Sequence, residues 1–299
     1  MRGPGNAAVL CSLLFAPAVW GEDATYTYRM RGEVRLLLFW MGRDGVGGGK
    51  ISLRRGGGEA RWWEEVEVVF GSEPARVPGH VNRWGYARER AEWEMAGEKP
   101  ALVRTVFDGL MRHTDSKTSA GVLRDNRGET ARGLYQYKAL HGEAARGGAT
   151  AEIRIFHDPR EFHYRAPESL VARYNAGIAS QPAMESRRLA PTRYGDPAGF
   201  LTGLRALVGR VLDGEERPSA MVLHNATVYR VEVKNAAPGA VRAIRFGCMN
   251  MERKTRTEFS LEAPAEGPLR GIPVRIEYQP NWWLRVRLDM EPPVGAARR

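Results

Sequence analysis

Residues 26–40 (YTYRMRGEVRLLLFW) decide the fold class of this chain. The apolar positions fall on one parity and are Tyr26, Tyr28, Met30, Val34, Leu36, Leu38 and Trp40. The alternate positions from Thr27 to Arg35 are polar. A period of two over this length predicts a β-strand with one face in a core and the other in water. The glycine-rich residues 42–49 are expected to turn the chain into a second strand at 50–54 and so complete a hairpin.

Alternating patterns of this kind recur along most of the chain. Strands are expected at 62–70, 83–95, 101–107, 151–156, 161–165, 220–223, 228–233, 241–248, 257–261, 274–278 and 282–288, although 88–92 is equally compatible with a helix. A short helix is expected at 168–178. A second helix is expected after Asp196 and Pro197, because Asp caps free backbone N–H groups and Pro fits the first turn. Its apolar face consists of Phe200, Leu201, Leu204, Leu207, Val208 and Val211.

Many half-buried strands joined by hairpins predict a mainly β fold. We expect an antiparallel β-barrel or half-barrel with one or two short helices packed at its mouth. Residues 22–299 are expected to form a single β-rich domain. Residues 108–149 are rich in Gly and Arg, and only 134–140 suggest a regular element there. We therefore expect a mobile insertion at 108–149.

The first 21 residues are typical of a bacterial export signal. A positive start at Arg2 precedes the apolar run AAVLCSLLF, and small residues offer cleavage after Ala18 or after Gly21. The run is shorter than the roughly 20 residues that span a bilayer, and no later segment is long and apolar enough to do so. The alternatives are a buried element of the mature fold, or a lipoprotein signal ending at Cys11, which the large Leu10 disfavours. We expect export to the periplasm or cell envelope.

Charge and cysteine content narrow the function. The formal net charge is +10, and most of the basic residues are arginines. This favours an anionic partner such as lipid, lipopolysaccharide or acidic glycan over a merely solvated surface only weakly, and export disfavours nucleic acid. Of the 2 cysteines, one lies in the leader, so the mature chain keeps only Cys248 and has no intramolecular disulfide. Cys248 is expected to be a small buried apolar residue.

Three segments together resemble an uncharacterised bacterial family of exported β-barrel proteins. The opening Tyr26-Thr-Tyr-Arg strand with its glycine-rich turn resembles the start of that family, and Asp196 and Pro197 before an apolar helix resemble its middle. Residues 271–276 (GIPVRI) followed by the strand at 282–288 resemble its C-terminal hairpin. Residues 108–149 depart from the family pattern. The resemblance implies a β-barrel fold and an envelope location, and it carries over no functional residues.

Motifs for catalysis are weak. Residues 45–50 (GVGGGK) imitate a phosphate-binding loop, but Asp44 replaces its first glycine, Ile51 follows the lysine, and a strand rather than a helix comes next. No GxSxG or HExxH motif is present. His157 and His163 flank a predicted hairpin with Asp158 and Glu161 between them, which makes them weak metal-site candidates. A shift of one residue in register would separate the two imidazoles.

Tryptophan provides the strongest hint of a ligand site. The predicted ligand-binding residues are Trp62, Trp84, Trp93, Trp283, Arg285 and Arg287. Rings on strand faces beside guanidinium groups suit an amphiphile with an acidic head, whereas rings covered by arginine stems would be structural.

The sequence therefore predicts a non-catalytic exported envelope protein that binds an amphiphilic or anionic ligand in the barrel mouth, with no cofactor. One alternative is a structural protein that docks a partner through sheet edges or through 108–149. Another is a metal-dependent hydrolase centred on His157 and His163. The oligomeric state stays open.

Overall fold

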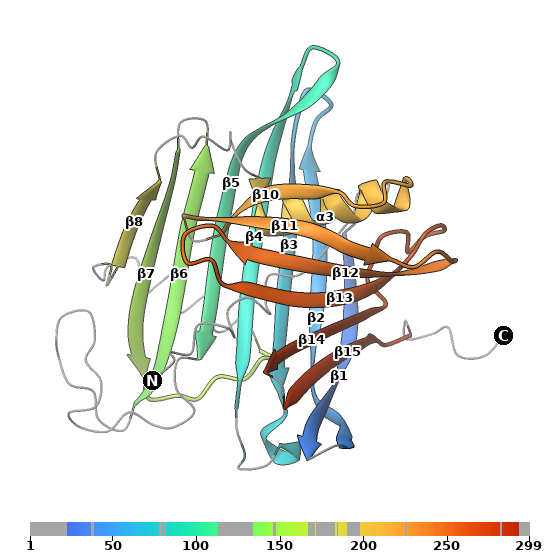
Figure 1. Ribbon diagram of the computed structural model, residues 1–299. Helices are drawn as coiled ribbons and strands as arrows, with labels where there is room; N and C mark the ends of the chain where they lie inside the picture. Colours follow the sequence, from blue (N-terminus) through green and yellow to red (C-terminus); the bar gives the residue numbers. More distant parts are fainter. Residues whose placement is uncertain are drawn as a thin grey trace.

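The computed structural model describes residues 23–36, 39–77, 80, 82–112, 134–145, 148–166, 171, 183, 185–189, 198–224, 226–281 and 283–292. Within these ranges the chain forms one 15-stranded sheet and one α-helix, which confirms the mainly β fold class (Figure 1). None of the helical segments in this part of the chain has the length and apolar character needed to cross a bilayer.

The elements follow one another with short connections. The first strands are β1 (Ala24–Leu36), β2 (Phe39–Gly57), β3 (Arg61–Ser72), β4 (Trp84–Ala96), β5 (Lys99–Arg112), β6 (Tyr135–Ala145), β7 (Gly148–Asp158) and β8 (Glu185–Leu189), with the 3-10 turn η1 (Pro74–Arg76) between β3 and β4. The rest are β9 (Ala198–Gly199), helix α3 (Phe200–Leu212), β10 (Ser219–His224), β11 (Thr227–Ala236), β12 (Val241–Asn250), β13 (Arg256–Pro264), β14 (Arg275–Asn281) and β15 (Leu284–Met290).

The sheet consists of two arms that share a single junction. Strands β8 to β1 lie in order and form the first arm, strands β15 to β9 form the second, and β1 pairs with β15 between them. All pairs are antiparallel except β9 with β10. The second arm crosses in front of the first at a steep angle, so the sheet curls over itself (Figure 1).

The main core lies between the two arms, where the inward parity of each strand meets helix α3. It includes Ile51 and Val68 of the first arm, Phe246 and Leu261 of the second, and Leu204 of the helix. A hydrogen bond also links the arms, because the buried Tyr28 hydroxyl donates to the carbonyl oxygen of Pro273 at 2.7 Å. The inward residues predicted from the period of two at 26–30 are thus in the core.

The curl brings the edge strand β9 against the inner face of the first arm. Gly199 lies so close to β4 and β5 that a Cβ atom there would come within 2.4 Å of Glu89 Oε1 and 2.5 Å of Thr105 Cγ2. A short edge strand covered in this way offers no free ladder to another chain. The half-barrel therefore ends on its own wall, and no pairing of β8 with β9 closes it among the described residues.

A second core covers the opposite, outer face of the first arm. Trp84, Tyr86 and Tyr137 project there from β4 and β6, and the segment after β7 lays Phe162 and Tyr164 over them. The Tyr137 hydroxyl fixes this segment, since it donates to the carbonyl oxygen of Arg160 at 2.9 Å and accepts from the amide of Phe162 at 3.2 Å. Residues 161–165 are therefore a covering segment and form no strand, contrary to the expected hairpin with 151–156.

Two further expectations are corrected. Residues 42–49 form part of β2 instead of a turn, because the chain reverses between Leu36 and Phe39 and a bulge at Met30 and Arg31 absorbs the extra glycines. Residues 108–149 are no insertion in their described part: they complete β5, form all of β6 and begin β7, because the period of two in 135–145 has partners on both sides. Residues 113–133, the leader at 1–21, most of the helix expected at 168–178, and Asp196 with Pro197 lie outside the described residues.

Candidate anion-binding groove

Helix α3 occupies the space between the arms where a ligand was expected. Ten of its 13 residues are buried, including all six of the predicted apolar face. The helix contacts β4 of the first arm and β9 to β11 of the second. The helix was expected at the mouth, and its depth leaves the concave side of the sheet filled by the chain itself.

Polar contacts hold this helix in place at its first turn. No side chain of the chain just before α3 caps it. Instead the Glu89 carboxylate, 2% exposed on β4, accepts hydrogen bonds from the amides of Leu201 at 3.0 Å and Thr202 at 2.8 Å, and from the Thr202 hydroxyl at 2.7 Å. Burial raises the pKa of Glu89, and the hydrogen bonds from Thr202 and Leu201 oppose that rise. A negative group at this end also suits the helix dipole.

One turn further along, Arg205 reaches back to β3. Its Nη1 lies 2.7 Å from Glu64 Oε2 and its Nη2 lies 3.2 Å from Glu64 Oε1, a two-point pairing at a largely buried site. Burial lowers the pKa of Arg205, and the charge of Glu64 acts against that effect. Both buried acids therefore serve the attachment of α3, and neither faces an open ligand site.

The predicted tryptophan site is not one site. Trp62 and Trp93 lie opposite each other on β3 and β4 and stack with ring centroids 6.4 Å apart. Trp84 lies at the other end of β4, in the outer core beside Tyr137. Trp283 stands 42% exposed at the start of the last hairpin strand. The sequence found rings of each kind, but strand length separates them.

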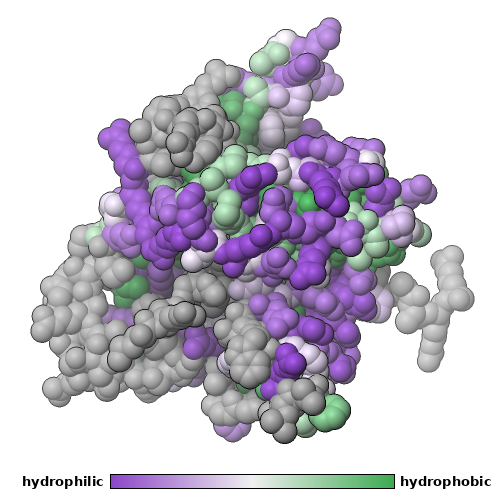
Figure 2. Space-filling view, in the orientation of Figure 1, coloured by the Kyte–Doolittle hydropathy of each residue, from purple (hydrophilic) through white to green (hydrophobic). Residues whose placement is uncertain are grey.

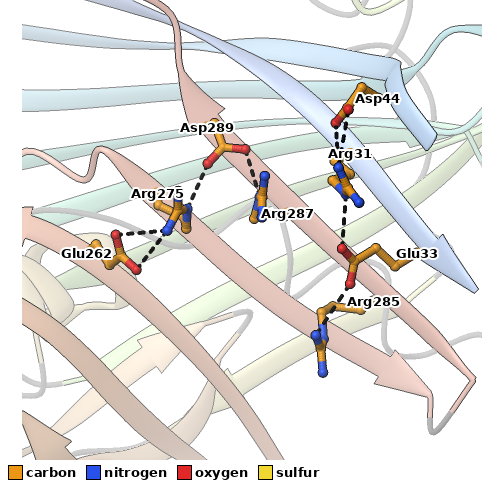
Figure 3. A network of polar contacts seen from close by, with 8 residues as sticks. All are labelled: Arg31, Glu33, Asp44, Glu262, Arg275, Arg285, Arg287 and Asp289. Atoms are coloured by element: carbon orange, nitrogen blue, oxygen red, sulfur yellow. Dashed lines mark hydrogen bonds and ion pairs between the residues drawn. The ribbon is translucent and has the colours of Figure 1, made fainter. Parts of the chain in front are cut away.

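Arg285 and Arg287 are also accounted for within the protein. Arg285 Nη1 lies 3.3 Å from Glu33 Oε2, and Arg287 Nε lies 2.8 Å from Asp289 Oδ2. Figure 3 shows both within chains of ion pairs that run from β2 to β13 and include Arg31, Asp44, Arg275 and Glu262. Such ladders on the outer face of the second arm make it predominantly hydrophilic in Figure 2 and leave these two arginines matched by acids.

The two histidines of the proposed metal site have separate partners. His157 Nε2 lies 3.2 Å from Gln136 Nε2, whereas His163 Nδ1 accepts from the amide of Arg165 at 3.3 Å. No group of three or more His, Cys, Asp or Glu side chains in the described ranges is arranged to hold a metal ion. Cys248 is buried as expected, and burial raises the pKa of its thiol to about 12.

A groove of about 670 Å³ lies on the outer face of the sheet, over β1 to β3. Its floor is glycine-rich, and its sides come from η1, from the covering segment after β7, and from the residue after β15. The lining residues are Thr27, Tyr28, Arg29, Asp44, Gly45, Gly47, Gly48, Gly49, Lys50, Val69, Arg76, Tyr164, Arg165 and Glu291. Its size matches pockets that hold small organic ligands, roughly 300–1,000 Å³.

Glycine is required in this floor for a geometric reason. A Cβ on Gly48 would meet the carbonyl oxygen of Tyr28 at 2.6 Å and the Tyr164 hydroxyl at 3.5 Å. Gly71 lies beside Gly48 on β3, and Tyr164 packs directly onto it. Gly45 has a φ of 65°, which glycine adopts without strain, and the Arg76 guanidinium lies over it. The bulged, glycine-rich start of β2 therefore creates the hollow.

Positive charge dominates the lining. Arg29 pairs with Glu291 at 3.3 Å in an exposed contact, and Arg165 pairs with Glu73 at 2.5 Å. Asp44 is engaged by Arg31 at 3.2 Å. Lys50 and Arg76 complete the lining, and no ion pair to either is found among the described residues. The arrangement can receive one or two anionic groups without displacing an existing partner.

Most of this groove was missed by sequence reasoning. Residues 45–50 were considered as a phosphate loop and rejected on sound grounds, since a strand follows them. The glycine run beside a lysine was nevertheless the available signal. Arg76 and Arg165 gave none, because they reach the groove from a 3-10 turn and from a covering segment far away in sequence.

Comparisons with known proteins concern the fold alone. No family model and no curated protein matches the chain. Among solved structures, the chain is similar to a beta-barrel-like protein of the domain of unknown function DUF1849 from Brucella abortus, with 10% sequence identity, a TM-score of 0.44, and coverage of 89% of this chain and 94% of that one. Export and envelope location stay predictions.

Proposed function

We propose that this chain is a non-catalytic envelope protein that binds an anionic ligand in the groove over β1 to β3. The observation that carries the proposal is the lining: Lys50 and Arg76 flank a side-chain-free floor, and neither has an acidic partner among the described residues. A site of this kind is ready for a carboxylate, phosphate or sulfate group because the ligand replaces no internal ion pair.

The location of the proposal differs from the one expected from the sequence. The mouth of the half-barrel is filled by α3, so the ligand is placed on the convex side instead. The net charge of +10 favours approach of an anion from solution. The leader-like residues 1–21 support an envelope setting, in which anionic lipid headgroups and acidic glycans are the available sources of such a ligand.

The test is calorimetric titration with matched probe pairs. Dioctanoyl phosphatidylglycerol is compared with dioctanoyl phosphatidylcholine, and an oligogalacturonate with a maltooligosaccharide of equal length. We expect binding of one anionic member and not of its uncharged or zwitterionic counterpart. The lipid pair and the glycan pair thus distinguish the two sources of the negative charge.

The matched variants are Lys50→Ala with Arg76→Ala, and Arg61→Ala with Lys99→Ala. Both pairs remove two exposed positive charges, but Arg61 and Lys99 lie at the far hairpin ends of β3 and β5. The first pair is expected to weaken binding roughly tenfold to hundredfold and the second to change it little. Equal affinities of the two pairs, or no binding of any anionic probe, would refute the proposal.

A further inference from the structure

The hairpin of β1 and β2 extends beyond the rest of the sheet. Strand β3 pairs with β2 only from Gly47 onward, and β15 pairs with β1 only as far as Val34. The start of β2, from Phe39 to Val46, therefore has β1 as its only strand neighbour among the described residues. We call this projecting end, together with Trp283 of the adjoining β14–β15 turn, the hairpin tip.

One face of the hairpin tip is apolar and exposed. The register pairs Val34 with Met41 and Leu36 with Phe39, so the side chains of Val34, Met41 and Phe39 share a face. Phe39 is 74% exposed and Met41 is 61% exposed. Four of the six large hydrophobic side chains that are exposed in the described part of the chain belong to the tip. Figure 2 shows a hydrophobic surface at the lower end of the molecule, where Figure 1 places this hairpin.

The other face carries aromatic rings and cations. Arg35 pairs with Trp40 in the register, and its amide donates to the carbonyl oxygen of Trp283 at 2.8 Å. The Arg285 guanidinium lies over the Trp40 ring, 4.6 Å from its centroid, and is held there by Glu33. Figure 3 shows that Glu33 and Asp44 are both taken up by arginines. Arg35 and Arg43 add positive charge, and no acid is paired with either among the described residues.

We propose that the hairpin tip inserts into the interface of an anionic lipid bilayer. Apolar side chains on one face suit the acyl boundary, tryptophan rings suit the headgroup level, and arginines suit anionic headgroups. A second copy of the same tip fits less well, because Arg35 and Arg43 would repel their counterparts. The inference is independent of the groove, which lies beyond the bulge at Met30 and Arg31, on the outer face of β1 to β3.

Vesicle sedimentation of the full chain tests this at low ionic strength, with phosphatidylcholine vesicles that do or do not contain phosphatidylglycerol. Phe39→Ser with Met41→Ser is expected to reduce partitioning onto the anionic vesicles at least about tenfold. The matched control, Met95→Ser with Val241→Ser, removes two exposed apolar side chains elsewhere and is expected to bind like the wild type.

Fluorescence quenching by brominated lipid reports directly on the tip. Trp283→Phe is expected to remove part of the quenching, whereas Trp84→Phe, in the outer core, is expected to leave it unchanged. Absence of wild-type binding overturns the proposal, as does equal binding of the tip and control variants. Quenching that survives Trp283→Phe intact, or a wild-type dimer that the tip variants abolish without lipid, also overturns it. Loss of anion binding by the groove variants would leave this result unaffected.

Discussion

Glu89 caps helix α3 from a strand 112 positions earlier in the chain. Its two carboxylate oxygens accept three hydrogen bonds, which satisfy donors that every helix leaves free in its first turn. A buried charge is costly unless such partners surround it. The residue therefore ties the position of the helix to the protonation and geometry of one side chain on β4.

Replacing Glu89 by Gln should destabilise the protein by about 1–3 kcal/mol, because the amide group would face donors of Leu201 or Thr202 in place of an acceptor. Thr202→Val removes only the hydroxyl donor and should cost less. Urea unfolding followed by circular dichroism measures both. A Glu89→Gln variant as stable as the wild type would show that the carboxylate does not hold the helix.

His224 makes stability depend on pH. Burial lowers its pKa from 6.5 to about 4, with Phe107 4.6 Å away by ring centroids. The unfolded chain therefore binds the proton more readily. The stability that neutral His224 supplies is complete above about pH 6.5 and is lost as the pH falls toward about 4, by at most roughly 3 kcal/mol.

His224→Gln should flatten the unfolding free energy between those two pH values. His141 supplies a control of opposite sign, since its hydrogen bond to Asp108 at 2.8 Å raises its pKa. Its contribution is present below pH 6.5 and disappears as the pH rises through the raised value. If His224→Gln leaves the acid limb of the profile as steep as in the wild type, another group must be responsible.

At the scale of the element, the strands were easier to predict than their ends. The period of two located β3, β4 and β11 to β13 well, because each buries one face. The glycines at 42–49 indicated a turn, yet the turn forms at the apolar Leu36 and Phe39. Glycine here serves close packing: a Cβ on Gly49 would lie 2.0 Å from the Phe70 ring, and no local pattern contains that long-range fact.

The closure of β9 on the first arm can be tested at Gly199. A methyl group there would press on Glu89 and Thr105, so Gly199→Ala should cost about 1–3 kcal/mol of stability. Gly58→Ala is the matched control, because a Cβ atom there would have no neighbour within 4 Å. Thermal and urea unfolding of the two variants compare them. Equal stability would mean that β9 does not lie against β4 and β5.

For the whole molecule, the decisive feature is that two arms of one sheet curl around their own helix. The sequence predicted a half-barrel and the apolar face of α3, since both follow from local periodicity. It could not predict how deep the helix lies, because that depends on Glu89 and Glu64 meeting α3 from distant strands. The predicted tryptophan site failed for a related reason: residues of one type were grouped without knowledge of which end of β4 each occupies.

The groove illustrates the same limit. Lys50 and the glycines beside it are a continuous stretch, but Arg76 and Arg165 join them only when η1 and the covering segment are in place. A ligand site on the convex face also contradicts the usual expectation that a barrel binds inside. The account therefore stands on one claim: the interior of the half-barrel is structural and the ligand binds outside.

Hydrogen–deuterium exchange tests this claim most directly, with the full chain measured alone and with saturating dioctanoyl phosphatidylglycerol or oligogalacturonate, whichever binds. We expect slower exchange in residues 44–50 and 164–166 and no change in 200–212. Protection of α3 and of the strands facing it, or no protection anywhere, would contradict the account.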